Sequence, residues 1–91
     1  MSVLKIVDDL PALLTVPKFK NDYDSFVWIM GRNKAIKELE TFVRKSSHKP
    51  LPYLTIAPNG VRKSLTLQFA SIWLDGYNAT VHKLEEEVMK L

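Results

Sequence analysis

The sequence contains no cysteine, which excludes disulfide bridges and metal sites built on thiolates. It also lacks an apolar run of the roughly 18–20 residues that a membrane-spanning helix needs, so we expect no membrane contact. The N-terminal segment is interrupted by Lys5, Asp8 and Asp9, a pattern unlike that of a signal peptide. These absences favour a cytoplasmic protein.

The side chains that catalysis and metal binding require are also scarce. The only two histidines, His48 and His82, fall in different predicted elements, whereas a metal site needs more donors. No serine has the glycine-flanked setting of a hydrolase nucleophile. Residues 60–64 contain a Lys-Ser pair but lack the glycine that directly precedes it in a phosphate-binding P-loop. We therefore expect no enzymatic activity, no metal and no cofactor.

A chain of 91 residues with 46% hydrophobic and 25% charged side chains is typical of one small globular domain. Its net charge of +3 is unevenly distributed, because residues 31–64 carry eight basic side chains against Glu38 and Glu40. The basic side chains are Arg32, Lys34, Lys37, Arg44, Lys45, Lys49, Arg62 and Lys63. A basic middle between acidic ends indicates an anionic partner such as nucleic acid, or else a helix face that is simply solvated.

The first half of the chain reads mainly as helix. Residues 1–20 are ambiguous, because Val3, Ile6, Val7 and Leu10 have helical spacing while VLKIV could equally form a short strand. A helix is predicted from Asn21, with Tyr23, Phe26, Val27 and Met30 on its apolar face and Gly31 at its end. Asn33 then caps a second predicted helix, whose buried stripe is Ile36, Leu39, Phe42 and Val43.

The second half is predicted to begin with a hairpin. Residues 53–57 favour a strand, 58–60 a turn and 61–63 a returning strand with basic residues near its tip. A helix capped by Ser64 or Thr66 follows and ends at Asp75-Gly76, and Asn78 caps a last helix. Its apolar seam forms either the core or a homodimer contact. The predicted fold class is α+β, a small, mainly helical single domain of four to five helices with a short two-stranded hairpin.

Within this second half, the stretch SLTLQFASIWLDGYNATVHKL is similar to the distal part of KilA-N domains, which occur in proteins of phages and large DNA viruses. The matching positions are Leu67, Phe69, Ala70, Ile72, Trp73, Leu74, Val81 and Leu84. Upstream, FVWIMGRNKAIKELETF resembles a segment of longer members at Trp28, Arg32, Ile36 and Leu39. The resemblance implies an N-terminal segment, 1–20, before a KilA-N-like core, 21–91. It also implies a non-enzymatic, DNA-binding transcription regulator of antirepressor type in the host cytoplasm.

Two sets of candidate residues follow. Contacts to double-stranded DNA are predicted for Arg32, Asn33, Lys34, Lys37, Arg44, Lys45, Lys49, Arg62 and Lys63. The alternative is a phage protein that binds and inhibits a host protein such as a polymerase, nuclease or defence factor. Candidate residues for a protein interface, including a homodimer through the C-terminal helix, are Tyr53, Tyr77, Val81, Leu84, Val88 and Leu91.

Overall fold

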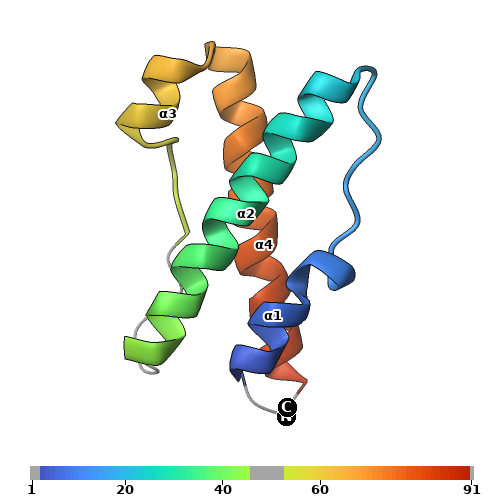
Figure 1. Ribbon diagram of the computed structural model, residues 1–91, viewed down its shortest axis with the longest axis vertical. Helices are drawn as coiled ribbons and strands as arrows, with labels where there is room; N and C mark the ends of the chain where they lie inside the picture. The colour runs from blue at the N-terminus through green and yellow to red at the C-terminus, as the bar shows by residue number, and fades with distance from the viewer. Residues whose placement is uncertain (1–2, 46–52, 91) are drawn as a thin grey trace.

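The computed structural model describes residues 3–45 and 53–90, and every regular element within these ranges is a helix. The helices are α1 (Val3–Leu13), α2 (Asp22–Lys45), α3 (Asn59–Ser64) and α4 (Leu67–Met89). The long helices α2 and α4 cross near their middles, while α1 and α3 lie on opposite sides of the crossing (Figure 1). The predicted α+β fold is therefore wrong, because the described fold is all-helical.

Two glycines mark the crossing of α2 and α4. A methyl group added at Gly31 would lie 2.9 Å from the carbonyl carbon of Trp73 and nearer still to its oxygen. At Gly76 it would lie 3.0 Å from the carbonyl carbon of Trp28. Only glycine permits such a close approach of two backbones. Neither glycine has a positive φ, and the helix ends predicted at Gly31 and Asp75-Gly76 are wrong because each helix continues through its glycine.

The core forms where α1 packs against both long helices. The sequence left a helix or a short strand open for this segment, and the structure has the helix α1. Its buried residues are Ile6, Val7 and Leu10, which have the expected helical spacing. Pro11 lies inside this helix two residues before its end, and it cannot donate the usual backbone hydrogen bond to the preceding turn. Other buried apolar residues include Val27, Ala35 and Leu39 of α2 and Tyr77, Val81 and Leu84 of α4. Burial of these side chains holds the three helices together.

Residues predicted as a hairpin instead contain α3. The amide of Arg62 donates to the carbonyl of Pro58 at 3.0 Å, which starts the helix, and Leu65 ends it in an extended conformation. Val61 and Leu65 are four residues apart, so a helix directs both toward α4, where they are half-buried. A strand would have placed Lys63 on the same face as these two residues. Helical spacing therefore buries the apolar residues without burying a lysine.

Residues 53–58 form neither a helix nor a strand, and Asn78 fixes them to α4. The amide of Leu54 donates to Asn78 Oδ1 at 2.9 Å, and Asn78 Nδ2 donates to the carbonyl of Leu54 at 2.7 Å. The predicted role of Asn78 as a helix cap is wrong, because this side chain lies inside α4 and pairs with a distant backbone. The cap of α4 is Thr66, one of the two predicted residues, whose hydroxyl accepts from the amide of Phe69.

Candidate functional site

Four of the predicted DNA-binding residues form a stripe along the outer face of α2. Positions 34, 37, 44 and 45 lie on one side of a helix, and Lys34, Lys37, Arg44 and Lys45 are all exposed. At 1.5 Å per residue, the stripe extends over roughly 16 Å. We call these four residues the basic stripe.

Carboxylates of the same helix neutralise part of the basic stripe. Lys34 lies 3.7 Å from Glu38, and Arg44 lies 3.1 Å from Glu40. Both pairs are exposed and one turn apart, so they contribute little and can exchange for another anion. Lys37 and Lys45 have no ion-pair partner among residues 3–45 and 53–90. The stripe therefore keeps a net positive charge.

The remaining DNA-binding candidates lie beside the stripe or on α3. Arg32 is half-buried, and its guanidinium donates to the Asn33 side chain at 3.1 and 3.2 Å. Arg62 and Lys63 are exposed in the last turn of α3, and Arg62 donates to Asn59 at the start of the same helix. Lys49 lies outside the described residues. The structure thus brings Asn33 and the start of the stripe near α3, with Arg44 and Lys45 further along α2.

An open groove of about 610 Å³ separates α3 from the stripe. Its apolar surface comes from Met30, Pro58, Val61 and Trp73, and a smaller hollow that shares three of these residues adds Leu65. Asn33, Lys34 and Lys37 line the α2 side of the groove. No carboxylate lines the groove within residues 3–45 and 53–90, so its described lining combines an apolar floor with a positively charged rim.

The groove adjoins an exposed apolar stripe on α2. The fractional exposures of Tyr23, Phe26 and Met30 are 50%, 58% and 40%, although the sequence placed all three on the buried face. The face that packs on α4 instead contains Val27, Trp28, Gly31, Ala35 and Leu39. Gly31 and Ala35 on this second face allow close packing on α4, which leaves Tyr23, Phe26 and Met30 on the more exposed side of α2. The sequence of α2 thus has two apolar faces, and a helix that packs on α4 with one face leaves the other face exposed. This was the signal in the sequence for the exposed stripe.

The residues predicted for a protein interface lie mostly inside the molecule. Tyr77, Val81 and Leu84 are buried in the core of the chain itself. Val88 is half-buried, and Leu91 lies outside the described residues. Burial raises the pKa of Tyr77 above its usual value, and so does the hydrogen bond from its hydroxyl to Glu38. The apolar seam of the C-terminal helix is therefore core at Val81 and Leu84.

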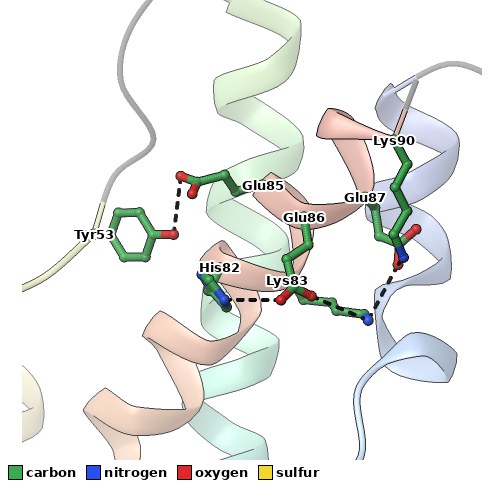
Figure 2. A network of polar contacts seen from close by, with 7 residues as sticks. All are labelled: Tyr53, His82, Lys83, Glu85, Glu86, Glu87 and Lys90. Atoms are coloured by element: carbon green, nitrogen blue, oxygen red, sulfur yellow. Dashed lines mark hydrogen bonds and ion pairs between the residues drawn. The ribbon is translucent and has the colours of Figure 1, made fainter.

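The last turns of α4 carry a network of paired charges (Figure 2). The network joins Glu85, Glu86 and Glu87 to Tyr53, His82, Lys83 and Lys90. Lys90 hydrogen-bonds Glu87 at 3.3 Å and thereby lowers the pKa of that carboxyl. Burial and the nearby Glu85 raise the pKa of Tyr53, whose exposed hydroxyl donates to Glu85 at 3.4 Å. This end of α4 is rich in carboxylates, in contrast to the basic stripe of α2.

Neither a metal centre nor a membrane span is present in the part of the chain that the structure describes. Within residues 3–45 and 53–90, no three His, Asp or Glu side chains gather closely enough to hold a metal ion. None of the described helices is long and apolar enough to cross a bilayer. Comparison of the chain with protein families, with curated proteins and with solved structures finds no match.

Proposed function

We propose that this protein is a non-enzymatic DNA-binding protein whose basic stripe on α2, together with α3, contacts the phosphates of duplex DNA. The observation that supports this proposal is the basic stripe itself, whose four cations are exposed on one helix face and have two carboxylate partners within the described part of the chain. A role in transcription regulation of the antirepressor type, in a host cytoplasm, is the function that the KilA-N resemblance implies.

The spacing of the cations suits a phosphate backbone. Successive phosphates of one strand rise by about 3.4 Å along the duplex axis, so a stripe of roughly 16 Å spans several of them. Lys63, exposed on α3, would add a contact on the far side of the groove. Each contact releases condensed counterions, so the affinity should fall steeply as the salt concentration rises. With about five contacts, the logarithm of the binding constant should fall with the logarithm of the salt concentration with a slope near −4.5.

The test is fluorescence anisotropy with a labelled duplex of mixed sequence, measured between about 50 and about 200 mM salt. Lys45→Glu and Lys63→Glu should each weaken binding and lower the salt slope by about 1. Lys18→Glu is the matched control, because it makes the same charge change at an exposed position outside α2 and α3. An absence of binding at low salt and micromolar protein, or an equal loss in the control, would contradict the proposal.

A second candidate function is the binding and inhibition of a host protein. The exposed Tyr23, Phe26 and Met30 support it, because a phosphate backbone gains little from an apolar stripe whereas protein interfaces favour aromatic residues and methionine. Affinity capture from host lysate, with and without nuclease treatment, separates the two functions. Partners that persist after nuclease treatment favour protein binding, and partners lost with the nucleic acid favour DNA binding.

A further inference from the structure

We propose that the groove between α2 and α3 binds an amphipathic helix of a partner protein, with acidic residues beside its apolar stripe. This inference rests on the second candidate function, protein binding, and names the chemistry of the partner. It depends on the apolar floor, the charged rim and the apolar stripe that continues beyond the groove.

The floor of the groove favours an apolar occupant. Met30 is 40% exposed and Val61 half-buried, while Trp73 is only 4% exposed beneath them. Covering this surface removes apolar area from water, which is the main favourable term in association. Phe26 lies one turn before Met30 on the same face of α2, so the apolar surface continues past the end of the groove. A continuous apolar strip of this kind suits a helix with anchors at i, i+3, i+4 and i+7.

The rim determines the charge of that helix. Among the residues that the structure describes, Lys34 and Lys37 are the only ionisable side chains that line the groove. Lys37 has no ion-pair partner in the described part of the chain, and Lys34 has only the exposed contact to Glu38 at 3.7 Å. Glutamates or aspartates flanking the apolar stripe of a partner helix would pair with both lysines. Such complementarity selects the partner and speeds its association.

Duplex DNA fits the rim but not the floor. Its phosphates can pair with Lys34 and Lys37, yet it has no apolar ridge to cover Met30 and Val61. Because the same two lysines belong to the basic stripe, an acidic helix and DNA would compete for them.

The experiment uses a labelled, tryptophan-free peptide of about 16 residues with leucines at helical spacing and glutamates on both flanks. The control peptide carries lysines in place of the glutamates. Fluorescence anisotropy should show the acidic peptide binding at least about tenfold more tightly than the basic one. Lys37→Glu should weaken the binding of the acidic peptide and strengthen the binding of the basic peptide. Loss of folding cannot produce this reversal.

Two further variants separate the groove from the DNA-binding surface. Met30→Gln, in the floor of the groove, should lower the affinity for the acidic peptide about tenfold. The same variant should keep its affinity for DNA within about twofold of that of the unmodified chain. Lys45→Glu, outside the groove, should weaken DNA but not the peptide. Equal binding of both peptides, or no binding up to about 1 mM, would overturn the inference without affecting the DNA proposal. If Met30→Gln weakened the binding of DNA and of the acidic peptide equally, the groove would be assigned to DNA, and this result would also overturn the inference.

Discussion

Replacing Gly31 with alanine perturbs the contact on which the fold depends. In an exposed helix, replacing glycine with alanine stabilises the folded state by about 1 kcal/mol, because alanine has the higher helix propensity. Here the new methyl meets the main chain of Trp73, which cannot rotate away as a side chain would. Overpacking costs roughly 1–3 kcal/mol, and a rigid obstacle places the cost at the upper end of that range. We expect a net loss of about 2 kcal/mol, or a melting temperature lower by about 8–16 °C.

Gly76→Ala should give a similar loss, because its methyl meets the main chain of Trp28 across the same crossing. The double variant should cost less than the sum of the two single variants. Once the first methyl has moved α2 and α4 apart, the second finds part of its space already open, and contacting sites are not additive.

Gly60→Ala is the matched control for both substitutions. Gly60 is also helical, but a methyl there would meet nothing within 4 Å. This variant should be neutral or up to about 1 kcal/mol more stable. The measurements are thermal melts and urea denaturation followed by circular dichroism. If Gly31→Ala and Gly76→Ala were as stable as Gly60→Ala, the two helices would not be in backbone contact and the packing argument would be refuted.

Three further predictions concern polar contacts. Asn78→Ala should cost about 1–3 kcal/mol, because it removes both hydrogen bonds to half-buried Leu54, and hydrogen exchange at the Leu54 amide should accelerate. The raised pKa of Tyr77 favours the neutral phenol in the folded state, so its stabilising contribution is complete below about pH 10 and falls progressively as the pH rises from there towards the higher pKa of the folded state. The stability difference between the unmodified chain and Tyr77→Phe should therefore begin to shrink between about pH 9 and about pH 11, and an unchanged difference in urea denaturation would contradict the raised pKa that burial and the hydrogen bond to Glu38 produce. Thr66→Ala should lower stability by about 1 kcal/mol through loss of the cap of α4, whereas Thr66→Ser should retain it.

Local signals in the sequence were sufficient for several element starts. Thr66, one of the two predicted caps, caps α4, and Asn21 accepts from the amide of Asp24 at the start of α2, where a helix was predicted to begin. These interactions span only three residues, so neighbouring residues in the sequence determine them. Gly31 and Gly76 are different, because glycine serves equally as a helix end and as a point of close helix contact. The choice depends on a helix that is distant in sequence, and no local pattern reveals it.

The hairpin prediction failed for a related reason. Pro58, Asn59 and Gly60 are common turn residues, but Pro58 also permits a helix to start, and the φ of Gly60 is not positive. The spacing between Val61 and Leu65 was the available signal for a helix, and it gains its meaning only when α4 provides an apolar surface to cover. Short apolar segments leave the choice between helix and strand open until their packing partner is known.

The candidate site divides in the same way. Helical spacing explains the exposed positions of Lys34, Lys37, Arg44 and Lys45. The sequence predicted these residues as contacts to DNA. The groove could not be predicted, because its walls come from α2, which the sequence divided into two helices, and from α3, which the sequence assigned to a hairpin. The exposure of Phe26 was also missed, since a helical pattern identifies an apolar face but not which of two faces is buried.

The crossing at Gly31 and Gly76 also explains why a groove exists. Helices that touch backbone to backbone at one point diverge on either side of it, as α2 and α4 do (Figure 1). The 11-residue α1 packs against both long helices on one side, whereas the six-residue α3 packs on α4 and leaves an opening toward α2 on the other. The width of that opening depends on how closely the long helices approach, because α3 is attached to one of them and Lys34 and Lys37 belong to the other. A methyl group at Gly31 that separates the helices should therefore widen the groove, so this variant should lose affinity for an acidic helix even at temperatures where it remains folded.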